Sequence, residues 1–176
     1  MKSRRKITTG TLVKASFLVA LSIVLTRFAT ILPVPTIRIG FGEVPLIING
    51  ILFGPIVGGI GGIAADLIGI MINPQGPPHL GFTFSSMLWG VIPGLYIMYF
   101  KKKNNGKDLY SAINIAIIVS TCFIIISLLL NTYWLSHLYQ KGVLALIPGR
   151  AIVALVNIPI QSAIIKILMK YFRRLA

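Results

Sequence analysis

The sequence predicts an all-α membrane protein with six transmembrane helices and cytoplasmic N- and C-termini, formed by a single domain over residues 1–176. Of its residues, 56% are hydrophobic and 11% are charged, whereas a soluble domain usually carries about 25% charged residues. Several apolar stretches reach the roughly 20 residues that a transmembrane helix needs. Basic residues gather beside these stretches, as they do on the cytoplasmic side of membrane proteins.

The N-terminal part of the chain predicts a long helix, a polar connection and a short helix. The long helix covers residues 12–32 and ends at the prolines of positions 33 and 35. The glycine-rich segment 36–43 predicts a loop or a short strand on the far side of the membrane. The short helix, 44–53, carries Pro45 near its first turn, where proline is tolerated. Its length is short for a full crossing.

The third predicted helix covers residues 56–72 and follows a tight turn at Gly54-Pro55. It carries five glycines, and small residues let neighbouring membrane helices approach closely. The next segment, 73–79, is rich in proline and predicts a turn-rich loop.

The C-terminal half predicts three more helices. One covers residues 82–100 and is expected to be interrupted at Pro93-Gly94. The last two cover residues 109–135 and 144–171. Six crossings place both termini on the same side of the membrane, which agrees with the basic residues at both ends.

Thirteen of the 17 basic residues lie in three clusters beside apolar segments, at the start of the chain, at positions 101–107 and at the end. The positive-inside rule accounts for these clusters, and contact with anionic membrane lipid follows from them. A nucleic-acid-binding protein needs a basic face on a folded soluble module. No segment remains for such a module, so we expect no nucleic-acid partner.

Four basic residues do not fit the topology: Arg27, Arg38, Lys141 and Arg150. Arg27 lies within the first helix, where an arginine at mid-span costs about 2.5–3.5 kcal/mol on insertion scales. Arg150 lies near the start of the last helix, and both are candidates for binding an anionic ligand. Arg27 would otherwise snorkel to the outer interface. Arg150 would otherwise anchor the interface or pair with an acid, Glu43 or Asp66. Lys141 is expected to be a solvated loop charge, and Asp66 to be paired within the protein.

Asn131 and Trp134 are spaced to share a helix face with His137 or Leu138. An aromatic ring beside an amide suits a flat heterocycle with hydrogen-bonding edges, but the periodicity alone favours an aromatic belt at the membrane interface. The two histidines have no carboxylate or cysteine at ligand spacing, so we expect no metal site. No nucleophile–base pair or phosphate-binding loop indicates catalysis or a cofactor.

Three stretches carry a resemblance to a known family: GPIVGGIGGIAADLIG (54–69), GFTFSSMLWGVIPGLY (81–96) and LNTYWLSHLYQKGVLALIPGR (130–150). The chain resembles an S component, the substrate-binding subunit of an energy-coupling factor (ECF) vitamin transporter. The third stretch is most similar to the folate-specific members. The resemblance covers nearly the whole chain.

The resemblance implies a multi-pass protein of the bacterial cell membrane that binds folate with high affinity and has no ATPase activity of its own. Its partners would be a shared transmembrane coupling subunit and two ATP-binding subunits. The family docks the coupling subunit with small residues on the first helix, which implies Ala15, Ser16 and Ala20 here. Packing between helices of the same chain would explain these small residues as well.

The ligand chemistry that the resemblance implies agrees with the residues. Folate joins an aromatic pterin and a benzoyl group to a glutamate with two carboxylates, which suit Arg27 and Arg150. Trp134 and Phe84 would stack on the rings, Asn131 would meet the pterin edge, and the loop 36–43 would close over the ligand. Two alternatives remain: an S component for another heterocycle, such as thiamin or a queuosine precursor, and a membrane scaffold without a transport function.

Overall fold

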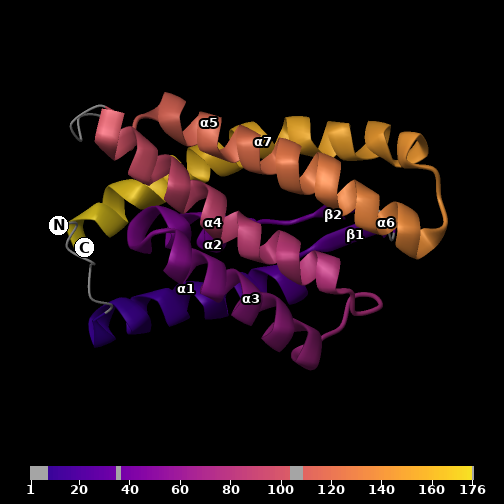
Figure 1. Cartoon of the computed structure of the whole chain (residues 1–176), viewed down its shortest axis with the longest axis horizontal. Coiled ribbons are helices and arrows are strands. Elements are labelled where there is room, and N and C mark those ends of the chain that lie inside the picture. Colours follow the sequence, from indigo (N-terminus) through magenta and orange to yellow (C-terminus); the bar gives the residue numbers. More distant parts are fainter. Residues whose placement is uncertain (1–7, 35–36, 104–108, 176) are drawn as a thin grey trace.

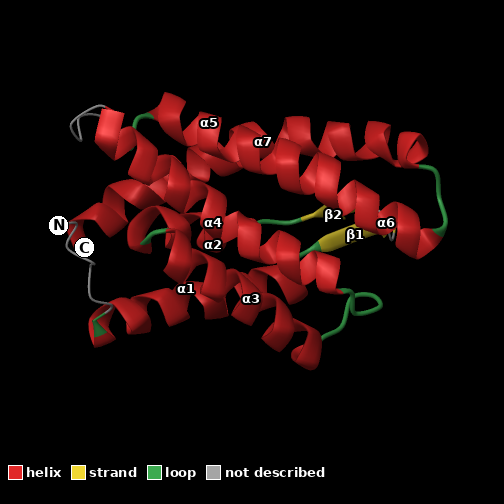
Figure 2. Ribbon diagram, in the orientation of Figure 1, coloured by secondary structure: helices red, strands yellow, loops and turns green. Residues whose placement is uncertain are grey.

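The computed structural model of the chain describes residues 8–34, 37–103 and 109–175, and most of them are helical (Figures 1 and 2). The basic residues predicted to anchor the N-terminal segment at positions 2–6, Lys107 and Asp108 lie outside the described residues. The helical elements are α1 (Thr9–Arg27), α2 (Glu43–Phe53), α3 (Pro55–Ile72), α4 (Leu80–Lys103), α5 (Ala112–Cys122), η1 (Phe123–Leu130), α6 (Asn131–Tyr139) and α7 (Val143–Leu175).

Five helical spans in the described part of the chain are long and apolar enough to cross a membrane. They are α1, α3, α4, the continuous run α5–η1–α6, and α7. The short helix α2 has 11 residues and rises about 17 Å at 1.5 Å per residue. Because a bilayer core is about 30 Å thick, α2 alone does not span it. The chain is therefore a multi-pass membrane protein by the length and composition of its helices.

A β-hairpin departs from the all-α prediction. Strands β1 (Ile31–Val34) and β2 (Ile37–Ile39) pair antiparallel, with Ile31 opposite Ile39. The first helix was predicted to reach residue 32, but it ends at Arg27. The prolines at positions 33 and 35 disfavour helix, and the β-branched Ile31, Val34, Ile37 and Ile39 around them favour an extended chain. The prediction that the segment 36–43 contains a loop or a short strand is confirmed, because β2 forms at Ile37–Ile39.

The later helices differ from their predicted ranges at a few points. The helix α4 continues through Pro93, so the predicted interruption at Pro93-Gly94 is wrong. Membrane helices tolerate proline because neighbouring groups satisfy the released backbone carbonyl. The fifth helix was predicted at 109–135, and its span covers Ala112–Tyr139. The predicted range 144–171 lies within α7.

Glycines hold α2, α3 and α4 in close contact. A methyl group built on Gly90 of α4 would overlap the carbonyl of Gly58 in α3, and one on Gly50 of α2 would overlap the carbonyl of Gly90. One on Gly62 would likewise overlap the carbonyl of Ser86. The backbones approach so closely that only glycine fits at these positions. This contact fixes the position of α2, which carries part of the site described below.

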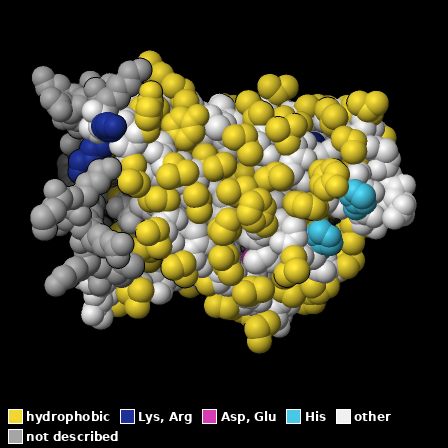
Figure 3. Space-filling view, viewed as in Figure 1, with side chains coloured by type: hydrophobic (Ala, Val, Ile, Leu, Met, Phe, Trp, Pro, Cys, Tyr) yellow, Lys and Arg dark blue, Asp and Glu magenta, His cyan; other side chains and the backbone are white. Residues whose placement is uncertain are grey.

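The outer surface of the bundle is apolar. Large hydrophobic side chains such as Phe17, Ile60 and Leu155 are more than 60% exposed, and Figure 3 shows hydrophobic side chains over the middle of one face. A soluble monomer rarely exposes such an area, whereas hydrocarbon covers it without cost. The described parts of the bundle thus present a lipid-facing surface.

The two ends of the bundle differ in charge. The start of α1, the end of α4, the start of α5 and the end of α7 lie at one end (Figure 1). The lysines of these segments define what we call the basic end: Lys14, Lys101, Lys102, Lys166 and Lys170. The loops 73–79 and 140–142 lie at the opposite end, which we call the loop end.

The glycine contact predicts a clear stability difference between two alanine substitutions. Gly90→Ala should lower the thermal unfolding temperature of the detergent-purified protein, because overpacking costs about 1–3 kcal/mol. Gly10→Ala in α1 is the control, since no atom of the described residues lies within 4 Å of the added methyl group. It should leave the unfolding temperature unchanged or raise it slightly. Equal unfolding temperatures for the two variants would contradict the packing described here.

Candidate functional site

Two neighbouring cavities lie between the helices. The inner cavity has a volume of about 60 Å³ and the outer cavity about 160 Å³. Asn131 of α6 and Arg150 of α7 line both of them. The loop 73–79 contributes to the wall of the outer cavity, which therefore lies nearer the loop end. The two cavities form one candidate binding tract with Arg150 at their junction.

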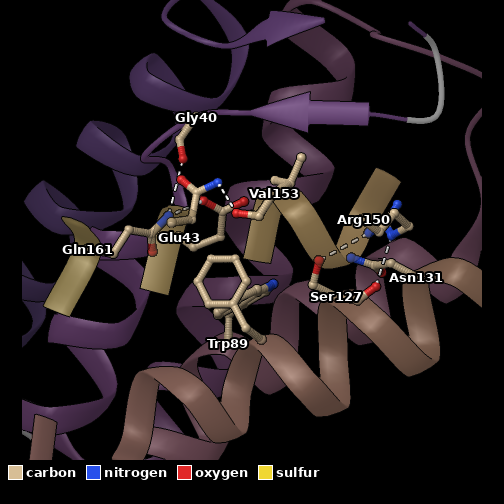
Figure 4. Close-up of a pocket in the computed structure, with 10 residues that line it drawn as sticks. Gly40, Glu43, Trp89, Ser127, Asn131, Arg150, Val153 and Gln161 are labelled. Carbon is tan, nitrogen blue, oxygen red and sulfur yellow. Dashed lines mark hydrogen bonds between the residues drawn. The ribbon is translucent and has the colours of Figure 1, made fainter. Parts of the chain in front are cut away.

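An acid and an amide meet in the inner cavity (Figure 4). Glu43 is the first residue of α2, and Gln161 extends from α7 with no exposed surface. Gln161 Nε2 donates to Gly40 O at 3.2 Å and to Glu43 Oε2 at 3.5 Å. Gln161 Oε1 is buried and accepts no hydrogen bond from the described protein residues. A ligand with N–H donors would satisfy this acceptor, whose isolation otherwise costs stability.

Two aromatic rings form the opposite wall of the inner cavity. Trp89 of α4 and Phe123 of η1 are buried, and their ring centroids lie 5.1 Å apart in an edge-to-face arrangement. Such rings supply apolar area for a flat aromatic ligand. Asn157 of α7 also lines this cavity, and its Nδ2 donates to Val153 O at 2.9 Å. The inner cavity therefore combines aromatic faces with amide and carboxylate oxygens.

Arg150 is held at the junction by Ser127 of η1. Its Nε donates to Ser127 O at 3.1 Å, and its Nη2 donates to Ser127 Oγ at 3.2 Å. The side chain of Arg150 thus carries positive charge to the point where the two cavities meet. A guanidinium at this place suits a carboxylate or a carbonyl oxygen of a ligand.

An ion pair and a hydrogen bond connect the helices α1, α3 and α4 beside the outer cavity. Arg27 Nη2 lies 3.3 Å from Asp66 Oδ1, and the two side chains are 6% and 11% exposed. Thr83 Oγ1 donates to Asp66 Oδ2 at 2.8 Å. The pairing that was predicted for Asp66 is confirmed. It neutralises the charge that made Arg27 costly in the first helix.

The same arginine also ties down the loop 73–79. Arg27 Nη1 donates to Asn73 O at 3.3 Å, and the backbone oxygen of Arg27 accepts from Asn73 Nδ2 and Gln75 Nε2 at 3.1 and 3.0 Å. These bonds fix the loop against the end of α1. Arg27 therefore shapes the outer cavity as well as lining it.

The structure brings together three of the five predicted ligand residues: Arg27, Asn131 and Arg150. Trp134 is half-buried, and its ring lies 5.5 Å from the ring of His79, which lines the outer cavity. Phe84 is 47% exposed on α4 and lines neither cavity.

The other predicted residues stand as follows. On α1, Ala15 is 6% exposed, whereas Ser16 and Ala20 face outward. Lys141 is exposed between α6 and α7, as expected of a loop charge. The side chain of Arg38 lies outside the described part of the chain.

Sequence reasoning missed most residues of the inner cavity, among them Glu43, Trp89, Phe123 and Gln161. Glu43 and Gln161 are polar residues within or beside apolar runs, and such residues mark functional sites in membrane proteins. Glu43 was considered only as an ion-pair partner of Arg150. Trp89 and Phe123 give no comparable signal, because aromatic residues are common throughout apolar helices.

Comparison with known proteins identifies the fold and the family. A family model described as "ECF transporter, substrate-specific component" matches residues 10–169. A protein of Clostridium novyi (strain NT) named "Folate transporter FolT" is 36% identical over 150 residues, which cover 85% of this chain and 82% of that protein. A protein of the same name from Leuconostoc mesenteroides is 29% identical over 164 residues, 90% of this chain and 84% of the relative.

A solved structure described as "Crystal structure of FolT bound with folic acid" superposes with a TM-score of 0.77. It is 26% identical in sequence, and the match covers 92% of this chain and 93% of the other. The resemblance seen in the three sequence stretches is thereby confirmed. The chain belongs to the family of substrate-specific components, or S components, of ECF transporters.

Proposed function

We propose that this chain is the folate-binding membrane subunit of an ECF transporter and takes up folate together with an ATP-driven module. The observation that carries the proposal is the paired cavity, which joins an aromatic and hydrogen-bonding inner wall to an outer wall that carries arginines. Its relatives named as folate transporters and the FolT structure bound with folic acid support the same ligand.

The inner cavity suits the pterin ring. The pterin presents an amino group and a ring N–H on one edge, and the oxygens of Glu43 and Gln161 are matching acceptors on α2 and α7. Trp89 and Phe123 provide the apolar contact for its faces. Asn131 borders both cavities and keeps its proposed place near the pterin edge.

The arginines suit the acidic end of folate. Arg150 lies between the cavities, and Arg27 borders the outer one, so a ligand with its pterin inside extends past both. Guanidinium groups bind carboxylates through two parallel hydrogen bonds. Arg27 is paired with Asp66, so we expect it to contribute less binding energy than Arg150 does. Trp134, beside His79, remains a candidate for contact with the benzoyl ring at the outer cavity.

The two alternative functions fit the cavities less well. A cationic ligand such as thiamin would meet the guanidinium of Arg150 at the junction. A membrane scaffold has no need for a half-buried, hydrogen-bonded arginine that lines two cavities. An anionic ligand with a flat ring uses both features.

The charge distribution sets the proposed orientation. The basic end faces the cytoplasm, with both termini there, because cytoplasmic flanks of membrane spans carry excess lysine and arginine. The loop end and the outer cavity then face the outside of the bacterial cell membrane. In this arrangement α2 completes a set of six membrane-embedded helices without crossing the bilayer alone.

The exposed side of α1 is the proposed contact for the shared coupling subunit, which would carry two ATP-binding subunits. Ser16 and Ala20 are exposed there, one helical turn apart, so a partner helix can approach closely. Ala15 is buried within the bundle and contributes to this contact only through the backbone. No ATPase activity is assigned to the chain itself.

The decisive experiment is to denature the purified protein and identify what it releases by absorbance and mass spectrometry. Release of a folate, together with folate binding in calorimetry, is the expected result. Release of no pterin and absence of folate binding would disprove the proposed function.

Removing Arg150 should weaken folate binding strongly. Arg150→Ala is expected to raise the dissociation constant by about tenfold or more, equivalent to about 1.4 kcal/mol, because a charge-assisted contact is lost. Lys141→Ala, which removes an exposed charge from a loop, is the control and should bind normally. Normal folate binding by Arg150→Ala, measured by calorimetry, would rule out the carboxylate assignment.

Removing Arg27 should affect both binding and stability. Arg27→Ala leaves the buried carboxylate of Asp66 without its ion-pair partner, which typically costs about 3–5 kcal/mol. We expect a lower unfolding temperature and weaker folate binding, with a smaller loss of affinity than Arg150→Ala causes. Asp66→Asn breaks the ion pair but keeps the arginine, so it should lower stability with a smaller loss of affinity. An equal loss of affinity in both variants would assign Arg27 a structural role only.

Glu43→Gln tests the pterin subsite. The substitution keeps the size of the side chain but removes its charge, and hydrogen bonds to charged groups contribute about 1.5–3 kcal/mol. Folate binding should weaken by about tenfold or more, while Gln140→Ala, at an exposed position outside both cavities, should leave it unchanged. If Glu43→Gln binds folate normally in calorimetry, the pterin lies elsewhere.

A further inference from the structure

The segment η1 (Phe123–Leu130) is a π-helix of eight residues within an otherwise α-helical span. π-helical turns are rare and are frequently found at functional sites. Here the backbone N–H of Asn131 donates to Ile126 O, five residues back. In an α-helix the same N–H would donate to Ser127 O, four residues back. The π-helical register therefore takes the α-helical donor away from the carbonyl of Ser127.

Arg150 donates to this same carbonyl. Its Nε donates to Ser127 O at 3.1 Å, and its Nη2 donates to Ser127 Oγ at 3.2 Å. The fully buried Thr132 also donates through Oγ1 to Ser127 O, at 3.3 Å. A guanidinium is planar and rigid, so two contacts along its Nε–Nη2 edge fix the direction of the whole group.

One face of this span lines the inner cavity. Phe123, Ser127 and Asn131 follow one another at intervals of four residues, and all three line this cavity. Figure 4 shows Ser127 and Asn131 on the same helix, next to Arg150. One segment thus supplies the aromatic ring of Phe123, the hydrogen bonds of Ser127 to Arg150 and the amide of Asn131 to the same site.

We propose that Ser127 is a positioning residue that aims Arg150 at a carboxylate of the ligand. The π-helical segment places Ser127 beside Arg150. The positioned arginine then gives the site a preference for pterins that carry a carboxylate. This inference rests on the proposed folate-binding function. Arginine loses considerable side-chain freedom on binding, and an arginine already held in place avoids part of that loss. Ser127 therefore acts on affinity through Arg150, without contacting the carboxylate itself.

The test compares two ligands that share one skeleton. Folate carries two carboxylates, and its dimethyl ester carries none, while the pterin and benzoyl groups are the same. Ser127→Ala should weaken binding of folate by about three- to tenfold, as expected for lost preorganisation of one long side chain. It should leave the affinity for the dimethyl ester unchanged. Ser136→Ala is the matched control, because Ser136 lies in the same span and its Oγ donates to Tyr133 O outside both cavities.

A double-mutant cycle separates positioning from a direct or structural role. If Ser127 acts through Arg150, the variant Ser127→Ala/Arg150→Ala should bind folate as well as Arg150→Ala alone does. Additive losses, an equal loss for folate and its ester, or normal folate binding by Ser127→Ala would each overturn the inference. Failure of the proposed function itself looks different: the unmodified protein would then bind neither folate nor the ester.

Discussion

Hydrocarbon offers no hydrogen-bond partner to a polypeptide, and this constraint governs where polar groups lie in the described parts of the bundle. Arg27 and Asp66 are both buried, and they satisfy one another across α1 and α3. Arg150 is satisfied by a serine of the neighbouring span. Because each buried charge needs a partner on another helix, these pairs also fix how the helices meet.

Close helix packing is the second condition of the site. Water does not drive helices together inside a bilayer, so association depends on how closely the backbones approach. Gly50, Gly58 and Gly90 allow α2, α3 and α4 to touch along their backbones. This contact holds the short α2 within the bundle and places Glu43, its first residue, beside the inner cavity.

The site joins these two conditions to a departure from regular helix. At the end of the π-helix the N–H of Asn131 bonds to Ile126 O, and the carbonyl of Ser127 accepts from the arginine at the junction of the cavities. A strictly α-helical span would use the same carbonyl for its own hydrogen bonds. Irregular backbone inside a membrane protein is tolerated where other protein groups satisfy it, and Arg150 and Thr132 do so here.

The sequence alone was enough to predict a helical membrane protein, most helix positions, the basic end and the family. These properties follow from composition and from residue order along one segment. The sequence also singled out Arg27 and Arg150, since a charge within an apolar run is conspicuous. The end of the first helix was wrong by several residues, because the extended pairing of Ile31 with Ile39 depends on a partner strand.

Only the tertiary structure decided which polar residues share a cavity. Glu43 and Gln161 are separated by 118 positions and meet because α2 and α7 pack together. Periodicity does not predict such meetings, because a helix that is apolar on nearly every side gives no sign of which face its neighbours cover. Packing likewise brings Arg150 of α7 to the carbonyl of Ser127 in the π-helical segment. The sequence therefore determined that this is a helical membrane protein with charges inside its spans. Packing decided which residues those charges contact and which cavity they line.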